Sequence, residues 1–339
     1  MILESSRRGL NLLGHGGDLS LARRLFPQAP EPFIDLSTGI NPRSYPLPPI
    51  PPEAFTRLPE ASALQRVAEL AADAYGAPGA ACVVPAPGSQ ILLPLVAALV
   101  SPGHAGILAP GFAGHARSAA LANHAVVETA TLDELASVNL AVLSNPNNPD
   151  GRLVMRQSLL ALAAELGRRG GLLVVDEAFM DVGPPGASLA GDVEHANIVV
   201  LRSFGKFFGL AGVRLGFALT RPDLAADLRT RLGPWAVSGP ALSAASVAFA
   251  DKPWASATRV DLAAAAIRLD QILLSAGLEI VGGTSLFRLV HTEHAPQLFD
   301  FLGRAGIFVR RFRARPTWLR IGIPGNDEAW NRLRAALES

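Results

Sequence analysis

The chain is poor in several kinds of residue, and each shortage excludes something. Cys82 is the only cysteine among 339 residues, which rules out an intrachain disulfide and fits a reducing compartment. The longest apolar run, Ile91 to Val100, contains Pro94 and is about half the ~20 residues that span a bilayer. The net charge is +1 and no long Lys or Arg run occurs, so we expect neither a nucleic-acid nor a membrane partner. The sequence predicts a soluble, cytoplasmic protein.

Lysine is almost absent as well. Of the 30 Lys and Arg residues, only Lys206 and Lys252 are lysines. Arginine stays protonated and forms no imine, whereas a desolvated lysine can lose its proton and attack a carbonyl. Phe204, Phe207 and Phe208 surround Lys206 and are expected to supply an apolar wall that lowers the pKa of its amine. Lys206 is therefore a candidate Schiff-base nucleophile, and the alternative is a surface lysine in a Gly-rich loop.

Composition and periodicity indicate an α/β protein. A hydrophobic content of 49% with 17% charged residues is typical of a globular enzyme. From residue 141 onward, short apolar runs alternate with segments of helical period, which predicts a mostly parallel sheet flanked by helices. The C-terminal part mixes strands and helices, as in a small α+β domain. We expect a large domain at 36–249 and a small domain that combines 1–35 with 250–339.

Three polar clusters directly follow apolar runs that are expected to be strands. In a parallel sheet, ligands bind beyond the carboxyl ends of the strands, so these clusters are candidate site residues. They lie at 145–151, 176–179 and 203–206. The expected strands are 141–144, 172–178, 197–201, 285–290, 307–310 and 318–323, and the expected helices are 157–169, 262–275, 295–306 and a final one from 327.

The string SFGKFFGLAGVRLGFA, from residue 203 to 218, contains S-x-x-K followed by G-x-x-G-x-R-x-G. This pattern resembles that of pyridoxal-phosphate enzymes with the aspartate aminotransferase fold, known as fold type I. The resemblance implies that Lys206 binds the cofactor pyridoxal 5'-phosphate covalently, and that Ser203 and Arg214 hold its phosphate. It also implies a large domain with a mostly parallel sheet and a small α+β domain.

Further motifs of this family occur in the expected order along the chain. The resemblance assigns the cofactor's ring nitrogen to Asp176 and its phenolic oxygen to Asn148, in SNPNNPDG. Phe112 would stack on the ring, and Phe179 stands where many relatives have a Tyr that bonds the phenolic oxygen. The last part of the predicted cofactor site is the start of a helix, where Gly88, Ser89 and Gln90 would present backbone amides to the phosphate. Each motif alone also fits a cap, a turn or core packing, but together they are specific.

Residues outside the cofactor motifs narrow the reaction. In WLRIGIPG, Arg320 stands where the family binds the substrate α-carboxylate, and Arg310 is a candidate for a second anion. The strings GHGGD and IDLSTGINP resemble the opening of the decarboxylase branch of the family, whose members act on L-threonine O-3-phosphate in cobalamin biosynthesis. By this resemblance, Asn41 lies beside the substrate carboxylate and His15 near its phosphate.

The expected function is therefore decarboxylation of L-threonine O-3-phosphate to (R)-1-aminopropan-2-yl phosphate by a homodimer. Leu58 stands where the family has a Tyr that reaches the partner's cofactor phosphate, so that contact is in doubt. The competing interpretation is a histidinol-phosphate aminotransferase or a related aminotransferase. His291 and His294 have spacing compatible with a metal, but no other ligand cluster accompanies them, and we predict no metal site.

Overall fold

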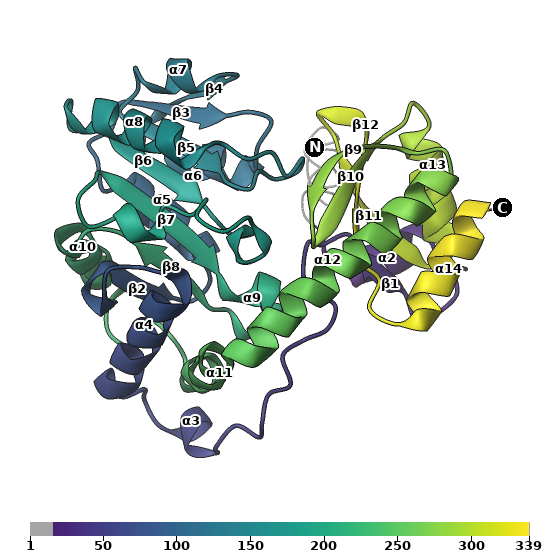
Figure 1. Cartoon of the computed structure of the whole chain (residues 1–339), viewed down its shortest axis with the longest axis horizontal. Coiled ribbons are helices and arrows are strands. Elements are labelled where there is room, and N and C mark those ends of the chain that lie inside the picture. Colours follow the sequence, from purple (N-terminus) through teal and green to yellow (C-terminus); the bar gives the residue numbers. More distant parts are fainter. Residues whose placement is uncertain (1–15, 339) are drawn as a thin grey trace, which may run out of the picture. The chain divides into compact units, whose positions relative to one another are not determined.

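A computed structural model describes residues 16–338, which form two compact units (Figure 1). One unit combines residues up to 43 with those from 258 onward, and the other comprises 44–257. Each boundary falls eight residues after the one predicted from the sequence. No helix within residues 16–338 is both long enough and apolar enough to cross a membrane.

The unit of residues 44–257 is built on a seven-stranded sheet in the order β2-β8-β7-β6-β5-β3-β4 (Figure 1). Strands β7, β6, β5, β3 and β4 are parallel, and β8 runs antiparallel to both β7 and β2. The predicted mostly parallel sheet is thereby confirmed. The strands are β2 (Val83–Ala86), β3 (His104–Leu108), β4 (Ala125–Thr129), β5 (Leu140–Ser144), β6 (Leu172–Asp176), β7 (Ile198–Ser203) and β8 (Gly216–Leu219).

Helices cover this sheet because successive strand residues point to opposite faces and are apolar on both. Leu140 and Val142 of β5 pack in one cluster with Leu92 of α5, Ala119 of α6 and Leu228 of α10. The helices and short turns are α3 (Glu53–Thr56), α4 (Ala61–Tyr75), η1 (Ala80–Cys82), α5 (Ser89–Ala97), α6 (Ala113–Leu121), α7 (Leu132–Leu135), α8 (Arg156–Gly167), η2 (Met180–Val182), η3 (Ala190–Asp192), α9 (Phe204–Phe207), η4 (Ala211–Val213), α10 (Pro222–Leu232) and α11 (Gly239–Ala250).

The direction of the strands brings the sequence motifs to one edge. Since β2, β3, β5, β6 and β7 run the same way, their carboxyl ends share an edge of the sheet, and β8 begins there. The register places Ser144 beside Asp176, and Ser203 beside Gly216, which in turn pairs with Ala86. We call this the strand-end edge.

The other unit contains a five-stranded mixed sheet in the order β1-β11-β12-β10-β9. Its buried cluster includes Leu36, Phe299, Leu319 and Trp330 and joins the sheet to its helices. This mixture of strands and helices matches the small α+β part expected from the sequence. Its elements are α2 (Leu19–Leu25), β1 (Ile34–Leu36), β9 (Glu279–Thr284), β10 (Phe287–His291), α13 (Ala295–Arg304), β11 (Ile307–Phe312), β12 (Arg315–Gly322), α14 (Asp327–Glu338) and the larger part of α12 (Lys252–Ser275).

Candidate active site

Lys206 lies in the one-turn helix α9, directly after β7 at the strand-end edge. Its Nζ is 6.0 Å from the centre of the Phe179 ring, which follows β6. Gly205 permits this tight path, because a Cβ there would lie 2.7 Å from the Ala211 Cα. The rings of Phe204 and Phe207 are fully buried in an aromatic cluster that includes Trp254. Phe179 therefore places an apolar ring beside the amine.

Asp176 ends β6 at the middle of the sheet, and its carboxylate is held from two sides. The Oδ1 atom accepts the Ala178 amide at 3.1 Å, and Oδ2 lies 3.0 Å from Nε2 of His115. His115 is on α6, is almost completely buried, and makes an edge contact with the Phe112 ring. The carboxylate consequently has a fixed orientation, as a partner for a protonated ring nitrogen requires.

The N-terminus of α5 forms a cradle with the residues that precede β8. Gly88 has φ +86°, and a Cβ there would lie 2.8 Å from Nη2 of Arg214. A Cβ on Gly216 would lie 2.2 Å from the Ser89 backbone nitrogen, so the backbones of these two segments touch without side chains between them. Gln90 is exposed on the first turn of α5. Free amides at the start of a nine-residue helix, with a guanidinium beside them, suit a phosphate.

Asn145 and Asn147 fold the turn that carries Asn148. The Asn145 side chain bonds both the amide and the carbonyl of Val154, at 2.9 and 3.2 Å. Asn147 donates to the Pro110 carbonyl at 2.8 Å and so joins this turn to the loop that leads to Phe112. Both side chains are buried, whereas Asn148 and Phe112 are half-buried.

A network of buried ion pairs links β7 to the residues that follow β6 at the strand-end edge. Arg202, on β7, donates to Glu177 at 3.1 Å and to Asp181 at 2.9 Å, and all three side chains are at most 7% exposed. Burial lowers the pKa of Arg202, but the charges of Asp181 and Glu177 outweigh it and raise that pKa. The guanidinium also lies 4.2 Å from the centre of the Tyr75 ring. This network connects the strand before Lys206 to the turn that carries Phe179.

In the other unit, the structure pairs two arginines on adjacent strands. Arg310 of β11 and Arg320 of β12 are direct antiparallel partners. Arg320 is 7% exposed, donates from Nη2 to the Ser37 carbonyl at 3.1 Å, and lies 5.0 Å from the centre of the Phe287 ring. Burial and then the positive charge of Arg310 lower the pKa of Arg320, and Asp35 acts against both. Like charges in register disfavour each other, so this pair is suited to binding an anion.

Two further predicted residues belong to the N-terminal part of this unit. Asn41 is buried, and its Oδ1 accepts the Arg43 amide at 2.9 Å. His15 lies outside the described residues. Within residues 16–338 no three potential metal ligands gather into a group. His291 instead lies 3.0 Å from Glu279.

Sequence reasoning missed several residues that hold the predicted ones. His115 orients Asp176, and Asn147 holds the turn that carries Asn148. Arg202 anchors the strand that precedes Lys206, and Ser37 orients Arg320. A weak signal existed for His115, because it follows Phe112 by three residues at the start of a helix. The partners of Arg202 and Ser37 become visible only when strands distant in sequence pair.

The sheet order and the residues on its strand-end edge define a fold type I pyridoxal-phosphate enzyme. The family model "Aminotransferase class I and II" matches residues 55–337, and the chain belongs to this family. The cradle at Gly88 and the fixed carboxylate of Asp176 are chemically suited to the phosphate and ring nitrogen of this cofactor.

Curated relatives extend the comparison over the whole chain. A threonine-phosphate decarboxylase from Pseudomonas aeruginosa is 42% identical over 329 residues, which cover 96% of this chain and 97% of the relative. One from a Sinorhizobium species is 41% identical, covering 95% and 97%. A histidinol-phosphate aminotransferase from Mycobacterium bovis is 35% identical, covering 65% and 64%.

Solved structures share the fold. The histidinol-phosphate aminotransferase from Sinorhizobium meliloti, in complex with pyridoxal-5'-phosphate, has a TM-score of 0.76 at 22% identity, covering 94% of this chain and 92% of its own. The L-threonine-O-3-phosphate decarboxylase from Porphyromonas gingivalis has a TM-score of 0.74 at 18% identity, covering 89% and 98%.

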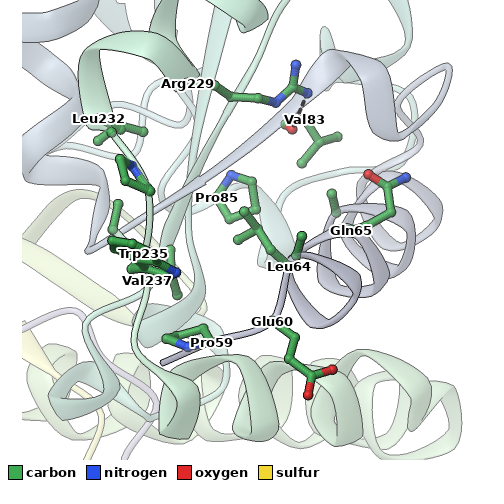
Figure 2. Close-up of a pocket in the computed structure, with 15 residues that line it drawn as sticks. Pro59, Glu60, Leu64, Gln65, Val83, Pro85, Arg229, Leu232, Trp235 and Val237 are labelled. Atoms are coloured by element: carbon green, nitrogen blue, oxygen red, sulfur yellow. Dashed lines mark hydrogen bonds between the residues drawn. The ribbon is translucent and has the colours of Figure 1, made fainter. Parts of the chain in front are cut away.

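A separate cavity of about 290 Å³ lies in the unit of residues 44–257 (Figure 2). Leu64, Pro85, Leu232 and Trp235 are among its lining residues, and Arg229 donates at its rim to the Val83 carbonyl at 3.0 Å. None of the predicted site residues lines it. Trp235 is 59% exposed and has φ +58°, a conformation that is uncommon outside glycine.

Proposed function

We propose that the chain is a pyridoxal-phosphate-dependent decarboxylase that converts L-threonine O-3-phosphate to (R)-1-aminopropan-2-yl phosphate in the cytoplasm. In this reaction the bond from Cα to the carboxylate breaks, CO₂ leaves, and a proton replaces it on Cα. The observation that carries the proposal is the near full-length similarity to two threonine-phosphate decarboxylases. The aminotransferase of M. bovis matches only two thirds of the chain.

The residues of the strand-end edge would hold the cofactor. Ser89, Ser203 and Arg214 would bind the phosphate, while Asp176 would bind the ring nitrogen. Asn148, Phe112 and Phe179 would contact the ring and its phenolic oxygen, and Gly88 and Gln90 would complete the phosphate turn. When bound, the cofactor supplies an electron sink for the electrons of the broken bond. Lys206 would bind the cofactor aldehyde and later deliver the proton to Cα.

The paired arginines would position the substrate. We propose that Arg320 binds the α-carboxylate, because its guanidinium is buried and held by the Ser37 carbonyl. Arg310 and His15 would bind the substrate phosphate, and Asn41 would lie beside the carboxylate. Holding the carboxylate decides which bond to Cα breaks, so these residues determine the reaction that the cofactor supports.

Two lysine variants test the reaction with a matched control. Lys206→Arg should abolish both CO₂ release and the visible absorbance band of the cofactor-loaded protein, since arginine forms no imine. Lys252→Arg should leave both unchanged, because Lys252 is exposed and forms a surface ion pair with Asp73 at 2.7 Å. The assay contains L-threonine O-3-phosphate and no keto acid. Turnover that requires 2-oxoglutarate and releases no CO₂ would instead establish an aminotransferase.

Two ligands test the arginine assignments. L-Threonine O-3-phosphate carries a carboxylate, whereas the product (R)-1-aminopropan-2-yl phosphate does not. Arg320→Ala should weaken binding of the substrate about 100-fold and of the product less than threefold, as the loss of a charged hydrogen-bond pair implies. Arg310→Ala should weaken both. On the cofactor-loaded protein, KM from initial rates of CO₂ release reports on the substrate, and the inhibition constant of added product reports on the product.

We also propose that the enzyme is a homodimer, as its family implies. Phe55, Leu58 and Trp235 are 66%, 65% and 59% exposed and belong to the unit of residues 44–257. Large exposed apolar side chains of this kind are enriched where proteins associate. Leu58 would reach the interface without the hydroxyl of the family tyrosine.

A further inference from the structure

Ser37 is completely buried and contacts three different parts of its unit. Its carbonyl accepts Nη2 of Arg320 at 3.1 Å. Its Oγ accepts the amide of Gly17 at 2.8 Å and donates to Oδ1 of Asp35 at 2.5 Å, and its own amide donates to the same oxygen at 2.9 Å. Ser37 thus joins Arg320, the predicted carboxylate-binding residue, to Asp35 and to residues 16–18, which we call the GGD segment.

The two glycines of the GGD segment are required by this contact. A Cβ on Gly16 would lie 2.3 Å from the Ser37 carbonyl oxygen, the atom that also accepts from Arg320. Gly17 has φ +91°, which favours glycine. Asp18 then caps α2 by accepting the Leu21 amide at 2.9 Å. The segment is therefore seated on Ser37, and a side chain at residue 16 would displace the acceptor of Arg320.

Asp35 supplies the negative charge on the other side of Ser37. It lies on β1, in register with Phe308 of β11, one strand away from β12. Its attraction favours the charged form of Arg320, against burial and the repulsion from Arg310. The same carboxylate oxygen holds the Ser37 amide and hydroxyl. Charge compensation and orientation of Arg320 consequently depend on one short turn.

We propose that Ser37 and Asp35 are positioning residues for the carboxylate specificity of Arg320. This inference rests on the proposed function, in which Arg320 binds the substrate carboxylate. Ser37 fixes the direction of the guanidinium through its carbonyl, and the hydroxyl links with Gly17 and Asp35 hold that carbonyl in place. Neither residue needs to touch the substrate.

The test compares substrate with product on the cofactor-loaded, full-length protein. Ser37→Ala keeps the backbone but removes the hydroxyl links, and should weaken binding of L-threonine O-3-phosphate about tenfold, as the loss of one or two hydrogen bonds implies. Binding of (R)-1-aminopropan-2-yl phosphate, which lacks the carboxylate, should change less than twofold. Ser20→Ala is the matched control, because Ser20 is exposed on α2. A purely structural role would weaken both ligands alike and overturn the inference.

Two further variants keep the test decisive if Ser37→Ala does not fold. Asp35→Asn retains an oxygen acceptor for Ser37 but removes the charge, and should again weaken only the substrate. Gly16→Ala should likewise weaken binding of the substrate and not of the product. In the double variant with Ser37→Ala, the loss of substrate affinity should be smaller than the product of the two single losses, since both changes act through the Ser37 carbonyl. If Arg320→Ala is selective for the substrate and these variants are not, the inference alone is wrong. If Arg320→Ala is not selective, the proposed function is wrong at its carboxylate site.

Discussion

At the residue scale, the least expected contact is between His115 and Asp176. The carboxylate is a proposed cofactor ligand, and the histidine fixes one of its oxygens at 3.0 Å while the Ala178 amide fixes the other. His115 is 2% exposed, so its ring is shielded from solvent on its own side of this contact. A carboxylate held from two sides keeps its direction without reorganisation when the cofactor ring nitrogen is protonated.

Replacing His115 tests this orientation. His115→Ala should lower kcat/KM about 100-fold, the size of effect that a misplacement near 1 Å produces, and should weaken cofactor affinity. His124→Ala is the control, because that histidine is also buried but bonds the Gly103 amide and the Ala97 carbonyl, away from Asp176. The control should lower thermal stability and leave kcat/KM within threefold. Steady-state kinetics and cofactor titration separate the two outcomes.

At the element scale, the important contact is between the start of β8 and the start of α5. Gly216 pairs with Ala86 of β2, and the Ser89 nitrogen lies 2.2 Å from where a Cβ of Gly216 would be. The helix N-terminus can approach the sheet this closely only because residue 216 has no side chain. The cradle for the phosphate therefore depends on packing between two elements as well as on its ligands.

Gly216→Ala should displace the Ser89 amide and weaken the affinity for pyridoxal phosphate at least tenfold, because the cofactor phosphate loses oriented backbone donors. Gly212→Ala, in the preceding turn η4, is a suitable comparison, since a Cβ there meets nothing within 4 Å. Fluorescence titration of the apoprotein measures both affinities. Equal affinities for the two variants would exclude the proposed cradle.

The same scale shows what the sequence could predict. Apolar runs predicted β5, β6 and β7 to within a few residues, because buried parallel strands read as continuous apolar segments. Helix α12 begins at residue 252, ten residues earlier than expected, since its Pro253 lies in the first turn, where proline is tolerated. The four-residue strand β8 has no periodicity of its own and is defined by pairing with β2 and β7. The proposed cofactor ligands were inferred from motifs, whereas His115 and Ser37 make contacts between distant segments that no motif indicates.

At the scale of the whole molecule, the proposed dimer accounts for the exposed apolar side chains. Leu58 and Trp235 are large, and Trp235 has a left-handed backbone conformation that a free loop would seldom retain. A second copy of the chain would bury them.

The combined variant Leu58→Glu with Trp235→Glu should shift the protein toward the monomer, because it introduces unpaired charges into an apolar interface. Leu121→Glu controls for adding a surface charge, since Leu121 is as exposed as Leu58 but lies on α6, outside the proposed interface. Sedimentation velocity measures the mass of each variant. A wild-type protein with the mass of a single chain would contradict the dimer.

The pairing of β2 with β8 also restricts when the cofactor can be captured during synthesis. Val83 pairs with Leu219, so the α5 turn gains its place at the sheet only after more than a hundred further residues have been translated. At about 5–20 residues per second, the ribosome needs on the order of ten seconds to produce them. For most of that interval the nascent chain carries Gly88 and Ser89 without Arg214 or Lys206. Cofactor binding therefore comes late in the synthesis of each chain.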